Sequence, residues 1–295
     1  MTVMVALTPD ERGTAALHLG TMMARSGRRP VLVATVVPTP WPPSSLPGEA
    51  EYLQYAERCA EQALTLARSR LGDELVADFV VQHARSVSSG LLELAAQRQV
   101  SLVVLGSSAA GLLGRVGLSG VAERILHSTH VPVMLAPRGF SASGTRVTRV
   151  TAAFGPSDAR SDLLAGAAAL ADSLGATLRV ASFSARPVTA FAGGIEQNAE
   201  DLVVHQWARQ LGAMIDAALP ASAGDGALAT RVESLVGQGS SWADAVAAVP
   251  WAAGDVLVVG SSSSAISSFL LGSHASKIVR NSPVPVYLMP RSLRD

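Results

Sequence analysis

The sequence predicts an α/β protein with two doubly wound, Rossmann-like domains, each a five-stranded parallel sheet covered by helices on both faces. Three observations carry this prediction. Short, β-branched apolar runs alternate with helical patterns, as is typical of parallel sheets that are buried on both faces. The stretch 256–291 has an earlier counterpart at 102–138, in which Gly106 matches Gly260. The 295 residues also suffice for two domains of about 150 residues each.

The long repeat divides the chain into two halves. A repeat of this length indicates a duplicated domain and not a solenoid unit. We place the first domain at 1–139 and the second at 146–295, joined by the small, polar linker Gly139–Thr145.

The first half is expected to begin with strand 3–7. Thr8 can then act as a helix N-cap, with Pro9 at the first helical position and Glu11 completing a capping box. The proline-rich segment 39–43 can form neither helix nor sheet. The first helix should run to about residue 25. The other helices expected here are 49–70, 87–97 and 121–128, and the other strands are 31–37, 75–81, 102–105 and 133–136.

The second half repeats this order. Its expected strands are 150–153, 177–182, 227–236, 256–259 and one beginning at 284, and its expected helices are 158–174, 195–219, 241–249 and 273–281. The loop Ser184–Gly194 corresponds to the proline-rich segment of the first half.

The composition excludes several classes of partner. Basic and acidic residues balance at 23 each, so no global field attracts nucleic acid or an anionic membrane.

Cys59 is the single cysteine, which excludes an intramolecular disulfide or a thiolate zinc cage and favours a reducing cytoplasm. The N-terminus has no basic region before its short apolar run, and no uncharged apolar run reaches membrane-spanning length. We therefore expect a cytoplasmic protein with no signal peptide and no membrane span.

The predicted topology also indicates where a ligand would bind. Doubly wound sheets bind ligands beyond the carboxyl ends of their strands, at the topological switch point. The loops after the first and fourth strands of each half, at Thr8, Gly106, Phe154 and Gly260, are therefore the places to search.

The loop after Gly260 has the features of an anion site. Gly260 ends a strand, a hydroxyl-rich segment follows from Ser261 to Ser268, and Gly272-Ser273 opens a helix. Unpaired amides and the positive end of the helix dipole would point into such a loop.

These residues carry a resemblance to the universal stress protein family in its tandem two-domain form, over nearly the whole chain. Nucleotide-binding members of that family carry Gly-x2-Gly-x9-Gly-Ser/Thr after the fourth strand, where backbone amides and hydroxyls wrap the phosphates of ATP. In the second half Gly260 and Gly272-Ser273 match this pattern, Ser263 stands at the second glycine, and eight residues separate it from Gly272.

The first half follows the same pattern less closely. Gly106 matches, Ala109 stands at the second glycine, and Ser119-Gly120 occupies the closing pair in reversed order. The resemblance also implies an acidic residue at the end of the first strand. Here Thr8 aligns near that position, and Phe154 or Gly155 does so in the second half.

Three readings of function follow. The resemblance implies a non-catalytic stress-response regulator that binds ATP or another adenine nucleotide, mainly in its C-terminal half. The alternative is a nucleotide-free tandem scaffold that works through protein contacts, and a slow ATPase is a third, weaker reading. The candidate nucleotide-binding residues are Gly260, Ser261, Ser262, Ser263, Gly272 and Ser273, with Gly106, Ser107 and Gly120 in the first half.

No catalytic or metal-binding residue is predicted. The sequence has neither a Gly-x-Ser-x-Gly elbow nor a Gly-x4-Gly-Lys-Ser/Thr loop. His127 and His130 are three residues apart but have no third ligand beside them. Arg115 and His274 could each approach a phosphate, although a solvated arginine and an exposed first-turn histidine are the plainer readings. Cys59 is expected to be a small packing residue.

The edge strands 131–136 and 284–289 raise the question of partners, because an uncovered edge strand invites pairing. The resemblance implies that the two strands meet within one chain as an internal pseudo-dimer. A further homodimer and a regulatory protein partner of unknown identity stay open.

Overall fold

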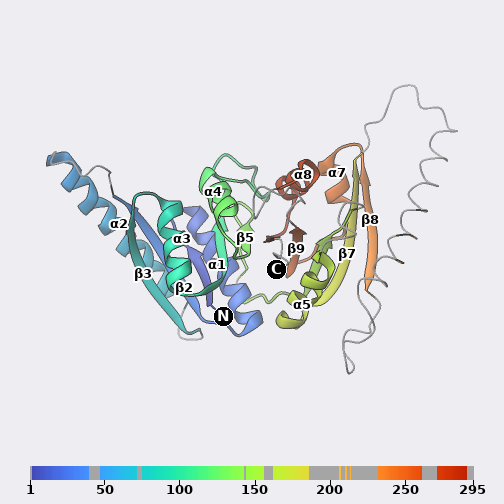
Figure 1. Cartoon of the computed structure of the whole chain (residues 1–295), viewed down its shortest axis with the longest axis horizontal. Helices are drawn as coiled ribbons and strands as arrows, with labels where there is room; N and C mark the ends of the chain where they lie inside the picture. Colours follow the sequence, from blue (N-terminus) through green and yellow to red (C-terminus); the bar gives the residue numbers. More distant parts are fainter. Residues whose placement is uncertain are drawn as a thin grey trace.

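The computed structural model describes residues 2–39, 47–71, 75–142, 144–155, 162–185, 206, 210, 213, 232–260 and 271–290. Its strands form one continuous ten-stranded sheet, with the first half of the chain on the left of Figure 1 and the second on the right. The strand order is β3-β2-β1-β4-β5-β10-β9-β6-β7-β8. Among the described residues, no helix is both long and apolar enough to span a bilayer.

The first half contains nine elements in the predicted order. They are β1 (Thr2–Ala6), α1 (Glu11–Gly27), β2 (Val31–Pro38), α2 (Pro47–Leu71), β3 (Ala77–Ala84), α3 (Val87–Gln97), β4 (Val100–Gly106), α4 (Gly120–Ser128) and β5 (Val133–Ala136). The third strand begins two residues later than predicted and runs three residues further.

The second half repeats the order, as predicted. Its elements are β6 (Arg149–Ala153), α5 (Leu163–Leu174), β7 (Thr177–Ala185), β8 (Glu233–Gly239), α7 (Trp242–Ala247), β9 (Asp255–Gly260), α8 (Ser273–Asn281) and β10 (Val286–Met289). Most of the helix predicted at 195–219, the beginning of the helix predicted at 158–174 and the beginning of the strand predicted at 227–236 lie outside the described residues.

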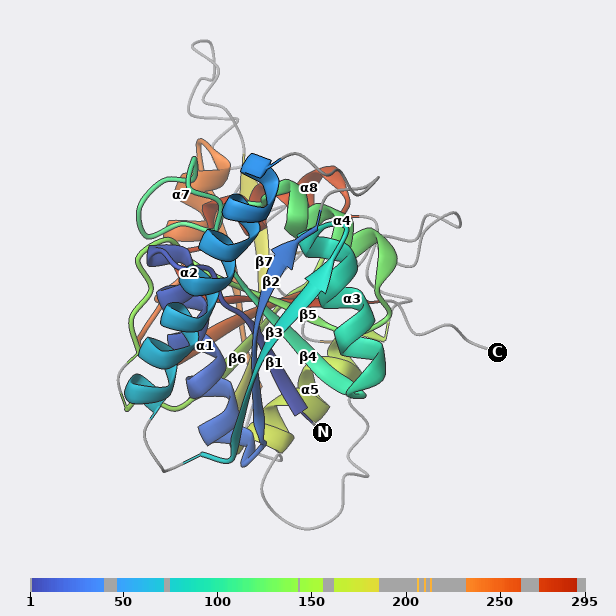
Figure 2. The ribbon, with the colours of Figure 1, turned by 90° about the vertical axis from the view of Figure 1, so that its left-hand side faces the viewer.

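Each half is a doubly wound sheet, which confirms the predicted fold class. In the first half β1 lies between β2 and β4 and is parallel to both, so the strand order reverses beside β1. In the second half β6 lies between β7 and β9 in the same way. Figure 2 shows α1 and α2 on one face of the first-half sheet and α3 and α4 on the other.

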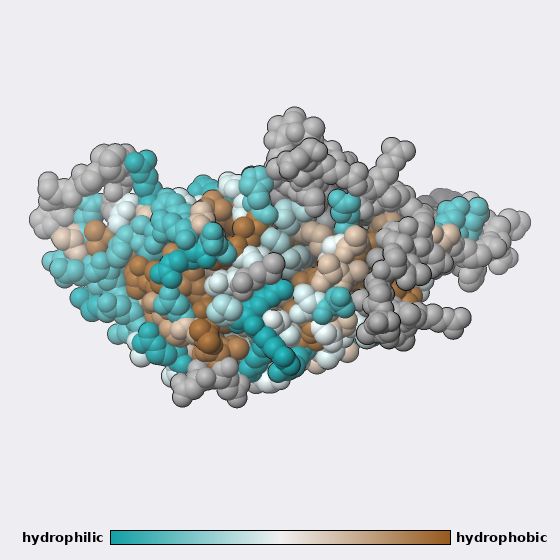
Figure 3. Space-filling view, turned by 60° about the horizontal axis from the view of Figure 1, so that its bottom comes forward, coloured by the Kyte–Doolittle hydropathy of each residue, from teal (hydrophilic) through white to brown (hydrophobic). Residues whose placement is uncertain are grey.

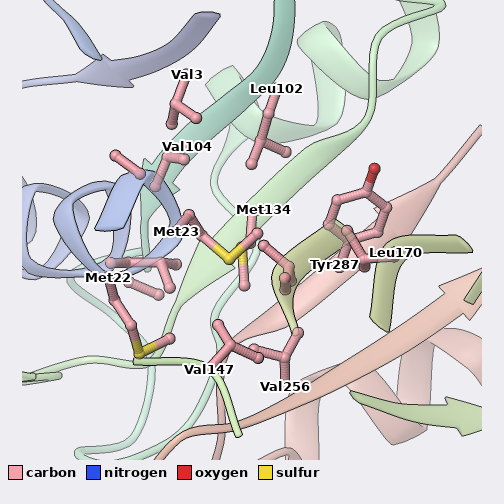
Figure 4. Close-up of a cluster of buried hydrophobic side chains, with 14 of the residues drawn as sticks. Val3, Met22, Met23, Leu102, Val104, Met134, Val147, Leu170, Val256 and Tyr287 are labelled. Atoms are coloured by element: carbon pink, nitrogen blue, oxygen red, sulfur yellow. The ribbon is translucent and has the colours of Figure 1, made fainter. Parts of the chain in front are cut away.

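The two halves are joined by their edge strands. β5 and β10 pair antiparallel, with Met134 opposite Tyr287, so the predicted internal pseudo-dimer is present as one sheet. Figure 4 shows Met23 and Met134 from the first half near Val256 and Tyr287 from the second. We call this junction of the two halves at β5 and β10 the seam. One apolar cluster therefore runs across the seam. Burial raises the pKa of Tyr287 to about 12, so its hydroxyl stays neutral in this core.

Because strand pairing and core both cross the seam, the halves should stay together when the linker is cut. A protease recognition sequence inserted after the exposed Gly144 would allow the folded chain to be cleaved there. We expect the two fragments to elute as one complex in gel filtration. Two separate fragments under native conditions would show that the shared core does not hold the halves together.

The beginning of α1 differs from the sequence prediction, which had placed the N-cap at Thr8. The N-cap is Asp10, whose carboxylate accepts hydrogen bonds from the amides of Arg12 (3.0 Å) and Gly13 (3.3 Å). Thr8 instead donates its hydroxyl to Asp10 at 2.6 Å. An aspartate satisfies two amides at once and adds a negative charge at the positive end of the helix, which accounts for its preference over threonine.

A buried charge cluster ties the second-half strands together near their amino ends. Arg179 is fully buried and donates to Thr151 (3.0 Å), to the carbonyl of Pro250 (2.9 Å) and to Asp255 (3.5 Å). Arg149 donates to both carboxylate oxygens of Asp255, at 3.0 and 2.8 Å. Asp255 thus pairs with the buried Arg179 and with the partly exposed Arg149, which also lies 3.9 Å from Glu233.

Candidate functional site

The candidate site residues lie where β4 and β9 end and where α4 and α8 begin. Gly106 and Gly260 are the last residues of β4 and β9, and Gly120 and Ser273 are the first residues of α4 and α8. The structure thus places corresponding residues of the repeat at corresponding carboxyl ends of the sheet. The two copies differ in detail, and the difference bears on which of them can hold a ligand.

The first-half loop is folded onto itself. The amide of Ser108 donates to the carbonyl of Gly117 at 2.9 Å, and the amide of Gly111 donates back to Ser108 at 3.0 Å. Ser107 is buried, and its hydroxyl accepts from the amide of Gly117 at 2.8 Å while donating to the carbonyl of Arg115 at 3.3 Å. These amides and the Ser107 hydroxyl are the kind of group that would donate hydrogen bonds to a phosphate, but they already form hydrogen bonds within the loop.

Gly106 and Gly260 also have different surroundings. A Cβ atom placed on Gly106 would lie 2.3 Å from the carbonyl oxygen of Arg12, in the first turn of α1. A Cβ atom on Gly260 would find its nearest neighbour, Leu163 Cδ1, at 3.5 Å, which is ordinary contact. Packing against α1 therefore explains the glycine at 106, whereas contacts among the described residues do not require one at 260.

The two helix N-termini are capped differently as well. Ser119 caps α4 by accepting a hydrogen bond from the amide of Ala122 at 3.1 Å. At the N-terminus of α8 the cap is Gly272, which has no side chain to accept such a bond. The first-turn amides of α8 thus lack the side-chain N-cap that α4 has in Ser119.

A family model for universal stress proteins matches residues 1–137 and 147–290. The chain belongs to this family. Universal stress protein Rv2319c of Mycobacterium tuberculosis (strain ATCC 25618 / H37Rv) is 32% identical over 295 residues, which cover 98% of this chain and 100% of the relative. Universal stress protein Mb2346c of Mycobacterium bovis matches to the same extent. The resemblance seen in the sequence is confirmed, and the tandem form with it.

Solved structures agree with the fold. A universal stress protein from Archaeoglobus fulgidus DSM 4304 superposes with a TM-score of 0.57 at 16% identity, covering 99% of this chain and 98% of that one. A structure from Pseudomonas aeruginosa UCBPP-PA14 gives a TM-score of 0.52 at 14% identity, with coverages of 98% and 92%. At such identities the likeness concerns the fold alone.

Arg115 of this universal stress protein has a role that neither reading of the sequence anticipated. Its guanidinium donates to the carbonyl of Asn281, at the end of α8 in the other half. Its backbone carbonyl also accepts from the amide of Arg138 at 2.9 Å. Arg115 is therefore neither a phosphate ligand nor a solvated loop residue but a contact across the seam, favoured by the negative end of the α8 dipole.

Among the described residues, the ends of the first strands of the two halves carry no free acid. Phe154 is buried in the core at the end of β6. In the first half the nearest acid is Asp10, which caps α1 and pairs with Arg12. Partial burial raises the pKa of Asp10, but hydrogen bonds from Arg12 and Thr8 outweigh burial, and the pKa lies below its ordinary value. Its carboxylate is thus ionised and engaged.

Sequence reasoning missed a cluster beside the N-terminus of α8. The rings of Trp242 and His274 lie 5.0 Å apart between their centroids, and Lys277 Nζ lies 5.8 Å from the Trp242 ring. The three-residue spacing of His274 and Lys277 places both on one face of the helix and is visible in the sequence. Trp242 comes from α7, and only the tertiary structure reveals its contact with them.

The three serines after Gly260 and the single cysteine complete the set of residues considered from the sequence. Ser261, Ser262 and Ser263 lie outside the described residues, so their part in a site stays a prediction. Cys59 is partly buried on α2. Within the described ranges, no group of three His, Cys, Asp or Glu side chains could hold a metal ion.

Proposed function

We propose that this universal stress protein is a non-catalytic stress-response regulator that binds an adenine nucleotide, ATP, in its second half only. The observation that supports a single site is the asymmetry of the two loops. The first-half loop uses its amides and Ser107 internally, whereas α8 begins at Gly272 without a side-chain cap. The family pattern at Gly260 and Gly272-Ser273 supports a nucleotide as the ligand.

The physical basis of the proposed site is phosphate binding at a helix N-terminus. The first-turn amides of α8, which have no side-chain cap at Gly272, and the positive end of its dipole attract an anion, and Lys277 adds a positive charge one turn further along. Gly260 leaves room for close approach of a phosphate to the backbone. Ser261, Ser262 and Ser263 would supply hydroxyl donors from the intervening loop.

We assign no chemical step to this site. Asp244, in the first turn of α7, accepts hydrogen bonds from the hydroxyls of Ser240 (2.6 Å) and Ser241 (2.8 Å). These two bonds lower the pKa of Asp244, which makes it a weak proton acceptor at neutral pH. Regulation by nucleotide occupancy needs no such acceptor.

The test is thermal unfolding with and without ATP and magnesium. Gly272→Val should abolish the rise in melting temperature, because a branched side chain at the N-cap obstructs the amides of α8. Its stability without nucleotide should change little, since Gly272 has a φ of −59° that valine can adopt. Wild-type protein should gain about 2.7 kcal/mol at a hundredfold excess of ATP over its dissociation constant.

Gly120→Val is the control in the first half, because Gly120 is the first residue of α4, directly after its N-cap Ser119, and no atom lies within 4 Å of a Cβ added there. It should retain the full response to ATP. If both variants lost the response to ATP, or if both retained it, the result would be incompatible with a single site in the second half.

The second candidate function is a nucleotide-free tandem scaffold that acts through a protein partner. Ser263 in place of the second glycine and the shortened span to Gly272 favour this reading. It predicts no thermal shift with ATP for the wild-type protein and no co-purified nucleotide in mass spectrometry. Under either reading we propose a cytoplasmic location, in keeping with the single cysteine, and a regulatory protein partner.

A further inference from the structure

A cleft of about 600 Å³ lies at the C-terminal end of α1, far from the proposed nucleotide site. Its lining includes four arginines, Arg25, Arg28, Arg29 and Arg146, and the apolar side chains of Leu75 and Val76. These residues precede β2, β3 and β6, so the cleft opens at the amino ends of the strands. Figure 3 brings this end of the molecule toward the viewer and shows hydrophilic and apolar side chains side by side across it.

Three of these arginines have no carboxylate partner among the residues that the structure describes: Arg28, Arg29 and Arg146. Two of the three are nevertheless held in place. Arg29 Nη2 donates to Ser173 Oγ at 3.2 Å, and Arg146 Nη1 donates to the carbonyl of Arg25 at 2.8 Å. Each guanidinium carries five N–H donors, so most donors of Arg28, Arg29 and Arg146 have no acceptor among the residues that the structure describes.

Arg28 occupies a backbone position that suits glycine. It is the C-cap of α1, with φ 51° and ψ 50°, and its amide donates to the carbonyl of Ala24. The corresponding C-cap of α5 in the second half is Gly175, with φ 64°. A non-glycine residue in this left-handed conformation costs conformational energy, which points to a function for the side chain.

The helix dipole explains only part of this arrangement. Cations are stabilised at the C-terminus of a helix, so the dipole accounts for arginines at the end of α1. It does not explain an arginine in place of glycine at the cap, because Arg25 and Arg29 already supply that charge. Nor does it explain why Arg146 comes from the connection between the two halves.

We propose that this cleft binds a phosphate-rich anion of the oligophosphate class at the seam between the two halves. Planar guanidinium groups pair with phosphate oxygens in bidentate fashion, and several convergent ones favour a multiply charged anion. The cleft volume lies in the range of small-molecule sites, which favours a small anion over an acidic protein surface. Arg29 contacts α5, and Arg146, in the connection between β5 and β6, contacts the end of α1, so occupancy stabilises the seam.

Tripolyphosphate titrated by calorimetry at low salt, with the full-length protein, tests the proposal. Arg28→Gly should raise the melting temperature without anion by roughly 1–3 °C, because glycine relieves the left-handed backbone. The same variant should bind tripolyphosphate about tenfold more weakly, since a charge-assisted contact is lost. Arg146→Gln should weaken binding to a similar degree, whereas the exposed Arg124→Gln on α4, which removes the same charge elsewhere, should not.

Several results would overturn the proposal. One is the absence of tripolyphosphate binding by the wild-type protein, and another is an equal loss in Arg28→Gly and Arg124→Gln. A third concerns Asp73 and Glu74, which lie outside the described residues and next to Leu75 in the sequence. If only Asp73→Asn/Glu74→Gln binds tripolyphosphate, the chain neutralises its own arginines. Gly272→Val separates the two sites, because it should leave tripolyphosphate binding intact whatever its effect on ATP.

Discussion

Replacing Asp255 by asparagine should lower the free energy of unfolding by about 3–5 kcal/mol, the cost typical of removing one partner from a buried ion pair. Asp255 is 2% exposed and compensates Arg179, which is fully buried, and Arg149. It also accepts a hydrogen bond from the amide of Ala252 at 2.9 Å. Asparagine preserves the shape but removes the carboxylate that contacts the buried Arg179, and it leaves Arg149 with only the exposed Glu233, 3.9 Å away. Urea unfolding followed by circular dichroism measures the change in midpoint.

An exposed ion pair of the same type supplies the control. Arg98 and Asp78 lie 2.8 Å apart with both side chains largely in solvent. Asp78→Asn should therefore change the unfolding free energy by no more than about 1 kcal/mol. If the two variants lost the same small amount, the cluster around Asp255 would not be the interior charge network described above.

The order of elements could be predicted because it depends on local patterns. The apolar runs of β1, β2 and β9 and the helical periodicity of α3 are each contained within a few residues of sequence. The repeat then supplied the second half from the first. Pairing of β5 with β10 followed from the family resemblance, since a strand pattern does not identify its neighbour.

Features that depend on distant residues could not be predicted. Arg179 reads as one polar residue in an apolar strand, and its partner Asp255 comes 76 positions later. Arg115 finds its acceptor at Asn281, 166 positions away. At the start of α1 the failure was local, because Thr8 and Asp10 are both good N-caps and only the backbone path decides between them.

The sequence could predict where the candidate site lies, but not whether the loop groups in it are free to bind a ligand. Switch-point reasoning located Gly106 and Gly260 at the ends of their strands, as the structure has them. Whether a loop amide is free or already bonded depends on how the loop folds. Ser107 shows the difference, because a serine that resembles a phosphate ligand in the sequence is buried and bonded to its own loop.

Gly106→Ala should destabilise the protein by about 1–3 kcal/mol, the usual cost of overpacking. The added Cβ would lie 2.3 Å from the carbonyl oxygen of Arg12, and a backbone atom in α1 cannot move aside as the end of a flexible side chain can. Gly260→Ala makes the same chemical change, meets only ordinary van der Waals contacts with Leu163 among the described residues, and should leave stability nearly unaltered. Thermal unfolding of both variants without ligand measures the contrast, and equal destabilisation of the two would contradict it.

The same pair of variants also distinguishes packing from binding as the reason for each glycine. If a phosphate approaches the backbone of Gly260, Gly260→Ala should weaken ATP binding although it leaves the fold intact. Gly106→Ala should affect stability and leave the ATP response of the second half unchanged, because the loop that follows Gly106 is closed by its own hydrogen bonds. A glycine matched in the family pattern would then have a structural role in one half and a ligand-binding role in the other.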